Sequence, residues 1–420
     1  MKTKALRLYG EKDLRLEEFE LPEMKQDEII AEIISDSLCM SSYKAAEQGK
    51  NHKKVPDNVC ENPVIVGHEF CGKILKVGEK WRFKYKEGDK FIIQPNLGID
   101  GGLAPGYSYN YIGGDATRVL IPSVVMENDC LLAYNGESYF EGSLVEPMSC
   151  VVGAFNASYH TKTGGGYVHE MGIRKGGNMI LLGATGPMGF LAIDFALHGD
   201  IKPKLLVVTG ITQHKIDFAR RLYTIEDAKT QGITLIYVNT RGMSDDVSYL
   251  RKLTYDNYGF DDVFILTPVK ALVESGTSIL AYDGCLNFFA GPQNKDFSAE
   301  FNFYDVHYNS IHVVGTSGGN TDDMKQALRL IENKDINVAK IATHVLGLNA
   351  AAETTLNLPS ISGGKKIVYT HKFLKLTEVS ELKNISDNDF TKELGRLVEA
   401  HDGLWNSEAE AYLITCAREI

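Results

Sequence analysis

The sequence predicts a two-part protein, in which an all-β region of barrel type is followed by an α/β unit with a doubly wound parallel sheet. Three observations support this prediction. The chain has 420 residues, more than one hydrophobic core normally supports. Up to about residue 150 it reads as short β segments broken by Gly, Pro and Asn. From about residue 155, apolar strands alternate with helical stretches, the pattern of parallel βαβ units.

The elements follow this division in order. The β region contains ALRLYG, EIIAEII, GKILKVG, DKFIIQP and ATRVLIP. The α/β region contains GNMILLGATGPMGFLAIDFALHG, PKLLVVT, HKIDFARRLY, TLIYVN, FDDVFILT, KALVESGTSIL and GCLNFFAG. A long helical stretch, TDDMKQALRLIENKDI, then leads to a final strand, KKIVYT. We expect residues 1–155, completed by 307–420, to form the first domain and residues 156–306 to form the second.

The last fifty residues predict two amphipathic helices. Caps are expected near Asp389 for the first and near Asn406 for the second, since Asp and Asn favour helix N-termini. The first helix would carry Phe390, Leu394, Leu397 and Val398 on one face. These helices could pack on the barrel or lengthen a contact between subunits.

Composition excludes several functions. The formal net charge is −11, which disfavours nucleic acid or an anionic membrane as a partner. No 18-residue apolar stretch occurs, and the start of the chain reads as a strand rather than a signal peptide, so a cytoplasmic location is expected. The seven cysteines are scattered and form no CxxC pair, which argues against a disulfide framework. A special cysteine here is therefore expected to be a metal ligand or a nucleophile.

The segment NMILLGATGPMGF predicts a strand, a glycine turn and a helix opened by Pro187, because proline suits the first helical turn. Gly186 would let the backbone approach a pyrophosphate, and Gly189 would allow close helix–strand packing. Ala184 stands where the first glycine of the dinucleotide fingerprint usually falls, so a βα turn without a ligand is the alternative. We predict a Rossmann-type nucleotide site that includes Ala184, Gly186, Pro187, Met188 and Gly189.

The next strand ends in TGITQHK, residues 209–215. Folds that prefer NAD place a carboxylate there, against the ribose 2′-hydroxyl, and this segment has none. We therefore include Thr209, Gly210 and Lys215 among the cofactor-binding residues and expect NADP(H), because a 2′-phosphate needs room and positive charge. A solvated helix lysine is the alternative for Lys215.

The stretch NPVIVGHEFCGKILKVG, residues 62–78, places His68 and Glu69 between an apolar run and glycines. Buried ionisable groups are costly unless they are paired, hydrogen-bonded or metal-bound. Taken singly, His68 could be a satisfied interior histidine, and Glu69 could be a partner for a cation such as Arg118. Cys39 could likewise be a small buried hydrophobe, and the cation-pairing explanation applies to Glu146 as well.

The motif GHEFCGKILKVG, followed by EGDK at 87–90, resembles the signature of the zinc-containing medium-chain dehydrogenase/reductase family, which includes alcohol and sorbitol dehydrogenases. The resemblance covers residues 1 to about 370, and it implies a GroES-like β-barrel catalytic domain plus a Rossmann domain. It also implies that Cys39, His68, Glu69 and the Glu146 of GSLVEPMSC hold a catalytic Zn²⁺. Thiolate, imidazole and carboxylate donors suit a tetrahedral zinc site with one open position.

Two departures from the family pattern matter. Many relatives hold a second, structural zinc with four cysteines near residues 95–115, but QPNLGIDGGLAPGYSYNYIGGD has no cysteine. We therefore expect a single metal and a lobe held by its tyrosines and backbone bonds. The aspartate and histidine that often follow the ligand cysteine are replaced by Ser42 and Lys44, which interrupts the family's usual proton exit route.

The resemblance implies hydride transfer between a nicotinamide and a substrate carbon, with zinc as a Lewis acid. It assigns catalytic roles to Ser41, as a proton relay, and to Glu69. For Ser41 a turn or cap role is the alternative.

Longer segments, among them DSLCMSSYKAAEQGKNHKKVP and GCLNFFAGPQ, resemble a bacterial branch that interconverts a ketose phosphate and a polyol phosphate. A phosphorylated substrate needs a cationic pocket, so Lys44 and His52, with Lys53 and Lys54, are the substrate-binding candidates. An ordinary solvated basic loop is the alternative.

Two other functions stay open. A zinc polyol dehydrogenase could act on an unphosphorylated sugar alcohol or on another sugar phosphate. A zinc-free nucleotide-binding protein of the same fold, with a sensing or structural role, is the alternative of another class, and the presence of all four candidate ligands argues against it. The family resemblance also implies a homodimer or homotetramer. It implies a small-molecule substrate, a sugar phosphate or a polyol.

Overall fold

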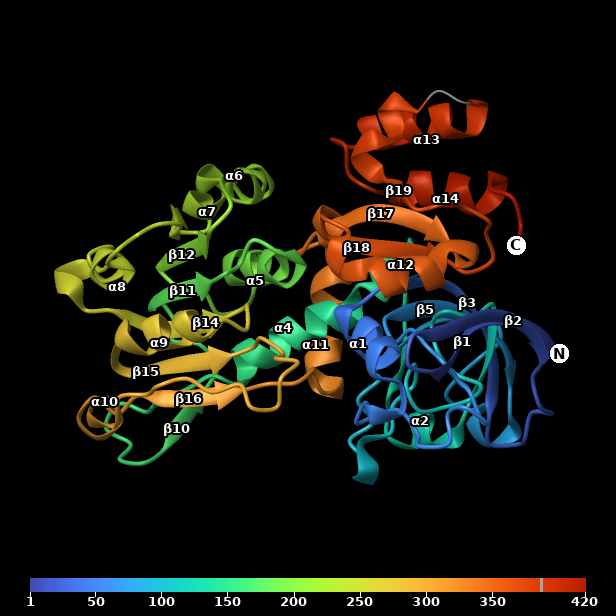
Figure 1. Ribbon diagram of the computed structural model, residues 1–420, viewed down its shortest axis with the longest axis horizontal. Helices are drawn as coiled ribbons and strands as arrows, with labels where there is room; N and C mark the ends of the chain where they lie inside the picture. The colour runs from blue at the N-terminus through green and yellow to red at the C-terminus, as the bar shows by residue number, and fades with distance from the viewer. Residues whose placement is uncertain (386–387) are drawn as a thin grey trace. The chain divides into compact units, whose positions relative to one another are not determined.

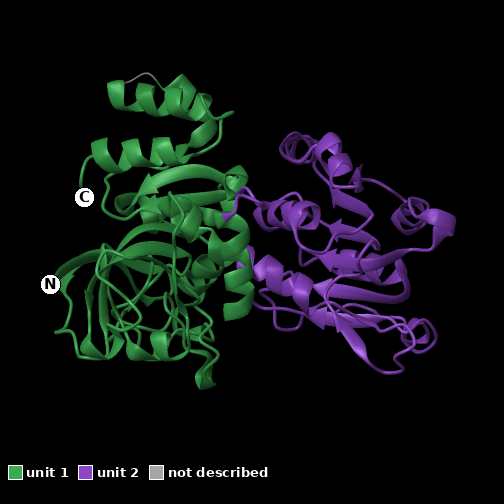
Figure 2. Ribbon diagram, turned by 180° about the vertical axis from the view of Figure 1, so that it is seen from behind, with its two compact units in different colours: residues 1–147, 320–332, 338–420 green, residues 148–319, 333–337 purple. Residues whose placement is uncertain are grey.

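The computed structural model describes residues 1–385 and 388–420, which form two compact units (Figure 2). Unit 1 comprises Met1–Pro147, Asn320–Glu332 and Val338–Ile420, and unit 2 comprises Met148–Gly319 and Asn333–Asn337. The units therefore divide at 147/148 and 319/320, whereas the sequence places the divisions at 155/156 and 306/307. The second division moves because residues 312–315 form the edge strand of the sheet in unit 2.

Unit 1 is built on an eight-stranded sheet, in the order β19-β17-β18-β3-β5-β6-β8, with β7 paired to β3. A second, three-stranded sheet has the order β2-β1-β4. The strands are β1 (Lys2–Gly10), β2 (Asp13–Glu20), β3 (Ile29–Ser37), β4 (Val64–Ile65), β5 (Phe70–Val77), β6 (Lys90–Ile93), β7 (Arg118–Ile121), β8 (Leu131–Ala133), β17 (Ala342–Gly347), β18 (Lys365–Tyr369) and β19 (Thr377–Glu378). Residues from both sheets share one hydrophobic core.

The strand β3 lies in the middle of the large sheet and is the element that leads to the site. Its first half is apolar and buried, as expected for a core strand. Its last three residues, Ser35, Asp36 and Ser37, are polar but at most 1% exposed. Buried polar groups at a strand end need partners, and this end is followed directly by Cys39.

Helices interrupt the predicted all-β region, so that part of the prediction was wrong in detail. The helices of unit 1 are α1 (Met40–Gln48), α2 (Ser123–Glu127), α3 (Tyr139–Ser143), α11 (Thr321–Glu332), α12 (Ala351–Asn357), α13 (Asp389–Glu399) and α14 (Ser407–Cys416), and α4 (Val145–Ala157) continues from unit 1 into unit 2. The sequence did not predict helix α1, because its buried face consists only of Ser42, Ala45 and Ala46. These small side chains form a weak apolar stripe.

Unit 2 contains a six-stranded, wholly parallel sheet in the order β13-β12-β11-β14-β15-β16 (Figure 1). Its strands are β11 (Asn178–Leu182), β12 (Leu205–Gly210), β13 (Thr234–Asn239), β14 (Phe260–Ile265), β15 (Leu280–Phe288) and β16 (His312–Gly315), and β9 (Tyr159–Thr161) pairs with β10 (His169–Met171). Its helices are α5 (Pro187–His198), α6 (Gln213–Leu222), α7 (Ile225–Thr230), α8 (Asp246–Arg251), α9 (Lys270–Ser278) and α10 (Phe303–Tyr308). This order is that of a doubly wound dinucleotide-binding sheet, so the predicted fold class is confirmed.

Short 3₁₀ turns connect several elements, at Gly49–Asn51, Glu79–Trp81, Asp100–Gly102, Tyr255–Asn257, Val338–Ile341, Leu348–Ala350, Leu358–Ser360 and Val379–Asn384. Among the described residues, no helix combines the length and the apolar character needed to cross a bilayer.

The two C-terminal helices pack on unit 1. The carboxylate of Glu410 accepts hydrogen bonds from the backbone N–H groups of Tyr139 and Phe140 at 2.6 and 2.7 Å. The Tyr369 hydroxyl donates to the same carboxylate at 3.0 Å and accepts from the indole of Trp405 at 2.7 Å. Burial raises the pKa of Glu410 to about 7 despite these donors.

The N-caps of these helices agree closely with the sequence. The second helix begins after Asn406, as predicted, and the first is capped by Asn388, one residue before the predicted Asp389. Leu394, Leu397 and Val398 are buried, and Phe390 stacks on Tyr412. The contacts of α14 with α3 and β18 show packing within unit 1, and a role of this segment in a subunit contact stays a prediction.

Candidate active site

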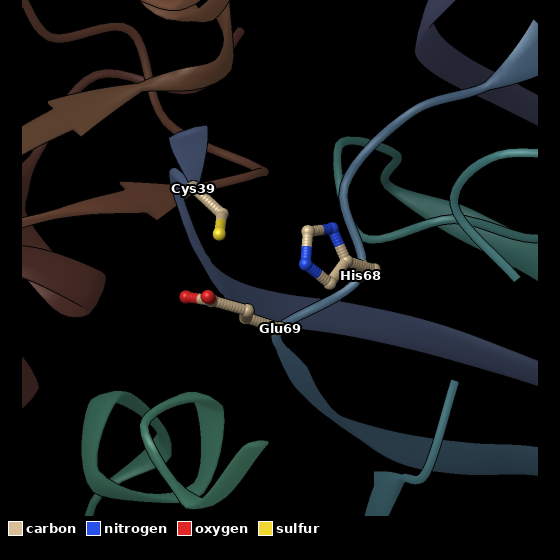
Figure 3. A group of neighbouring side chains, drawn as sticks. All are labelled: Cys39, His68 and Glu69. Carbon is tan, nitrogen blue, oxygen red and sulfur yellow. The ribbon is translucent and has the colours of Figure 1, made fainter. Parts of the chain in front are cut away.

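Three of the four predicted metal ligands meet in unit 1. Cys39 lies between Leu38, which follows β3, and the start of α1, and His68 and Glu69 lie in the connection between β4 and β5. Because β3 and β5 are antiparallel neighbours, with Asp36 opposite Phe70, these strand ends lie together. One ligand atom from each of Cys39, His68 and Glu69 lies within 4.8 Å of the others, and Figure 3 shows the three side chains gathered around a common space.

His68 is 4% exposed and is held from both sides. Its Nδ1 shares a hydrogen bond of 3.2 Å with Ser42 Oγ, and its Nε2 shares one of 3.1 Å with the hydroxyl of Tyr107. Burial lowers the pKa of His68 well below its usual value, and the nearby charges of Lys365 and Lys54 lower it further. The imidazole is therefore neutral, which is the form that binds metal ions.

Glu69 is 1% exposed and has a cationic partner that the sequence reasoning missed. Lys365, at the start of β18, donates to both carboxylate oxygens at 2.5 and 2.6 Å, and Ser37 Oγ donates to Oε2 at 2.5 Å. Burial alone would lower the pKa of Lys365, but the Cys39 sulfur in its ionised form and the carboxylates of Glu69 and Glu146 raise it above its usual value. The cation considered from the sequence, Arg118, instead donates to the Lys2 carbonyl.

The thiol of Cys39 needs a cation to ionise. Burial raises its pKa to about 12, and the Glu69 and Glu146 carboxylates contribute to the rise, while Lys365 opposes it. Only a thiolate binds a metal, so loading such a site releases a proton. A divalent ion among these sulfur, nitrogen and oxygen donors would supply the missing charge, and this donor set suits Zn²⁺. The residues present therefore fit a zinc ion.

Glu146 lies at the start of α4 and is 9% exposed. Its charge acts on Cys39, Lys365 and Tyr107. It is not part of the 4.8 Å group, so its role as a direct ligand stays a prediction.

The predicted relay and substrate residues surround this group within unit 1. Ser41 is half-buried and lies beside the side chain of Tyr107. Lys44 is half-buried on α1. The His52 imidazole is stacked on the Tyr107 ring, with centroids 5.8 Å apart and an interplanar angle of 9°. Tyr107 was not among the predicted site residues, and the only sequence signal for it is its position after the glycine of APGYSY.

The predicted nucleotide turn in unit 2 joins β11 to α5. Gly183 has φ +71°, which favours glycine. A Cβ on Gly189 would lie 2.2 Å from the Ala184 carbonyl oxygen, so close packing of the helix requires glycine there. A Cβ on Gly186 would meet nothing within 4 Å. The protein leaves open space at Gly186, just before Pro187 at the start of α5, and this space suits a pyrophosphate at a helix N-terminus.

The other predicted cofactor residues divide into two kinds. Thr209 is 1% exposed and accepts a hydrogen bond from the Gly183 N–H at 3.1 Å, so its contacts are with the turn itself. A Cβ on Gly210 would lie 2.6 Å from Thr185 Cγ2, so this glycine also shapes the turn. Lys215 is exposed on the first turn of α6.

Comparison with known proteins identifies the class to which this fold and site belong. A family model described as zinc-binding dehydrogenase matches residues 187–333, and one described as alcohol dehydrogenase GroES-like domain matches residues 25–132. The chain belongs to the medium-chain family of zinc-binding dehydrogenases, which are oxidoreductases.

Within that family, several relatives match along nearly the whole chain. The sequence is 54% identical to L-sorbose 1-phosphate reductase of Klebsiella pneumoniae, covering 100% of this chain and 98% of that protein. It is 47% identical to mannitol-1-phosphate 5-dehydrogenase of Aliivibrio fischeri, covering 98% and 97%. Among solved structures, 2R,3R-butanediol dehydrogenase of Bacillus subtilis matches with a TM-score of 0.71 and 21% identity, covering 88% of this chain and 99% of that one, which is a likeness of fold.

Proposed function

We propose that this protein is a zinc-dependent, nicotinamide-linked reductase that interconverts a ketose phosphate and a polyol phosphate, with L-sorbose 1-phosphate and D-glucitol 6-phosphate as the pair. The observation that carries the proposal is the group of Cys39, His68 and Glu69, whose ligand atoms lie within 4.8 Å of one another, in a chain that is 54% identical over its full length to an L-sorbose 1-phosphate reductase.

Cys39 and His68 would hold a single Zn²⁺, with Glu69 and Glu146 as carboxylates in or beside its coordination shell. When bound, zinc acts as a Lewis acid that polarises a carbonyl and lowers the pKa of the corresponding alcohol. A second, structural zinc is not part of the proposal, because the segment 94–115 has no cysteine.

The chain's own residues would then orient the reacting groups and move the proton. Ser41 lies beside the Tyr107 hydroxyl and would pass the substrate's hydroxyl proton in either direction. Lys365 and Ser37 hold the Glu69 carboxylate in one orientation, which fixes the charge beside the thiol. The hydride chemistry belongs to the nicotinamide.

NADP(H) is the proposed cofactor. The Gly183–Gly189 turn leaves room at Gly186 for the pyrophosphate. Strand β12 ends at Gly210, without the carboxylate that binds a ribose 2′-hydroxyl, and the exposed Lys215 follows on α6. Comparing kcat/KM for NADPH and NADH tests this point, and Lys215→Ala should reduce the preference for NADPH by about tenfold.

The substrate phosphate would bind on the side of the site formed by Lys44 and His52. Burial, together with the charges of Lys54, Lys53 and Lys44, lowers the pKa of His52 to about 4. Several cations gathered around one imidazole, in a chain of net charge −11, suit an anionic ligand.

The proposal includes a cytoplasmic location and a homodimeric or homotetrameric assembly, both typical of the family. Light scattering on the purified protein measures the assembly directly.

The proposal is tested by following oxidation of NADPH and NADH against a panel of sugar phosphates and free ketohexoses, with and without a chelator. We expect rapid turnover of L-sorbose 1-phosphate, loss of activity with the chelator, and recovery with added zinc. Equal turnover of free L-sorbose would favour a polyol dehydrogenase. Full activity in protein that elemental analysis shows to be free of zinc would contradict the metal site.

A second substrate is supported by one observation, the 47% identity to mannitol-1-phosphate 5-dehydrogenase. The same panel, run in the oxidative direction with mannitol 1-phosphate and glucitol 6-phosphate, separates the two. The substrate with the higher kcat/KM identifies the activity.

A further inference from the structure

Tyr107 lies at the centre of the candidate site although no sequence motif pointed to it. The side chain is buried, with 4% of the residue exposed. The imidazole of His68 lies on it with ring centroids 4.7 Å apart, and that of His52 is stacked on it at 5.8 Å. Lys54 Nζ stands 4.9 Å from its ring centroid. One aromatic ring therefore connects the predicted metal ligand with the predicted substrate-binding residues.

The backbone holds Tyr107 in this place without the cysteines that many relatives use in the same lobe. Gly106 has φ +79°, and a Cβ there would lie 2.1 Å from the Gly67 carbonyl oxygen. The lobe therefore lies directly against the turn that precedes His68, and only glycine permits this approach. Ser108 Oγ donates to the Lys54 carbonyl at 2.7 Å, which ties the lobe to the basic loop as well.

The hydroxyl of Tyr107 faces the reacting side of the site. It shares a hydrogen bond of 3.1 Å with His68 Nε2, and the side chain of Ser41 lies beside it. Ser42 is the partner of His68 Nδ1, so a metal bound through Nε2 would replace the Tyr107 hydrogen bond and leave that hydroxyl beside the metal. The hydroxyl therefore stands between the metal-binding nitrogen and the proposed proton relay.

The ring of Tyr107 carries the cationic side of the site. The backbone N–H of Lys54 donates to His52 Nδ1 at 3.3 Å, which leaves Nε2–H of the neutral imidazole as a donor. Lys54 lies over the same ring and provides a cation. A neutral N–H donor and an ammonium group held on one ring form a pair that suits a phosphate.

We propose that Tyr107 is a substrate-positioning residue that sets the spacing between the reacting oxygen and the phosphate of the substrate. Its hydroxyl orients the reacting oxygen together with Ser41, and its ring supports the His52–Lys54 pair that binds the phosphate. This inference rests on the proposed function and extends it, because one residue would couple phosphate recognition to alignment for hydride transfer. Alignment of this kind affects rate more than affinity.

Two substitutions separate the roles of hydroxyl and ring. Tyr107→Phe keeps the ring and removes the hydroxyl, so kcat for the sugar phosphate should fall by about tenfold or more with little change in KM. Tyr107→Leu also removes the stacking surface, so KM for the sugar phosphate should rise by about tenfold in addition. The matched control is Tyr109→Phe, since Tyr109 belongs to the same lobe but packs on the barrel core.

The measurements use the zinc-loaded enzyme, with zinc content checked for each variant. The dissociation constant of inorganic phosphate, measured by calorimetry, supplies a readout independent of turnover. It should be unchanged in Tyr107→Phe and about tenfold weaker in Tyr107→Leu. If the leucine variant does not fold, the kcat and KM of the phenylalanine variant decide.

Several outcomes overturn the inference. One is kinetics in Tyr107→Phe that match those of Tyr109→Phe. Another is loss of zinc or of thermal stability in parallel with activity, which would show a structural role only. The proposed function fails in a different way, because wild-type enzyme would then not distinguish phosphorylated from free ketose. If the wild-type enzyme distinguishes phosphorylated from free ketose but the Tyr107 variants have wild-type kinetics, the inference about Tyr107 is wrong and the proposed function stands.

Discussion

Each unit buries a cluster of ionisable side chains, and the two clusters differ in what they leave unmatched. In unit 2, the Asp283 carboxylate accepts hydrogen bonds from Thr161 and from Arg174, the latter at 2.6 Å, and pairs with His312 at 2.8 Å. In unit 1, Glu69 is paired with Lys365, but the Cys39 thiol lies beside that pair with a pKa raised by burial. In unit 2 the Asp283 carboxylate is matched by Arg174 and His312, whereas the unit 1 cluster holds a thiol in addition to its ion pair.

The pKa directions express this difference. Burial pushes the pKa of Asp283 upward, but the hydrogen bonds from His312 and Thr161 outweigh it and lower the pKa. Nothing outweighs burial for Cys39, whose pKa rises to about 12. A raised thiol pKa does not by itself mark a functional site, because burial raises the pKa of Cys285, beside the unit 2 cluster, to about 12 as well. What distinguishes the unit 1 cluster is its geometry, since ligand atoms of Cys39, His68 and Glu69 lie within 4.8 Å of one another there.

The largest effect is expected when the unit 1 cluster loses a metal donor. Cys39→Ala or His68→Ala should reduce reductase activity by about a thousand-fold or more, because the zinc contribution to the barrier is several kcal/mol. Steady-state assay and elemental analysis for zinc check the result. Cys60→Ser, at an exposed cysteine, is the control. Retention of both zinc and activity in Cys39→Ala would remove the proposed centre.

Removal of the buried cation should affect stability. Lys365→Met leaves the Glu69 carboxylate uncompensated and should lower the free energy of unfolding by about 3–5 kcal/mol. Denaturant unfolding in the presence of a chelator measures it, and added zinc should recover part of the loss. The double variant Lys365→Met/Glu69→Gln should be more stable than the single one. If it is not, the ion pair is not the source of the effect.

The unit 2 cluster should respond differently. Asparagine, like aspartate, tolerates the φ of +58° observed at position 283. Asp283→Asn therefore removes only the negative charge that Thr161, Arg174 and His312 contact. We expect a loss of about 2–3 kcal/mol in unfolding free energy and unchanged kcat per folded molecule. A marked fall in kcat at full stability would show that this cluster is also functional.

The smallest effect concerns pH. His160 pairs with Asp262 at 3.1 Å. Burial alone would lower the pKa of this histidine, but Asp262 and the Asp283 carbonyl raise it above its usual value. The stabilisation is then complete below about pH 6.5 and is lost as pH rises through the raised pKa. His160→Gln should therefore differ from wild type by about 1 kcal/mol at pH 6 and by less at pH 9. A difference that grows with pH would contradict the assigned pairing.

Much of the site could be predicted because its donors lie in local motifs. Cys39 follows a core strand, and His68 and Glu69 share one turn, so their types and order are legible in the sequence. The strand and helix alternation likewise predicts the parallel sheet. Lys365 was missed because it is separated from Glu69 by 296 residues. The only signal for it was a pair of lysines opening an apolar strand, GGKKIVYT.

The sequence by itself determined the donor chemistry, the glycine turn and the absence of cysteines from the lobe at 94–115. The tertiary structure decided which charges those donors meet. The pairing of β18 with β3, Ile367 opposite Ser37, brings Lys365 to Glu69, and the approach of Gly106 to Gly67 brings Tyr107 to His68. The physical reason is that strand register and backbone contact are set by burial of the whole core, and no local pattern of residues specifies them.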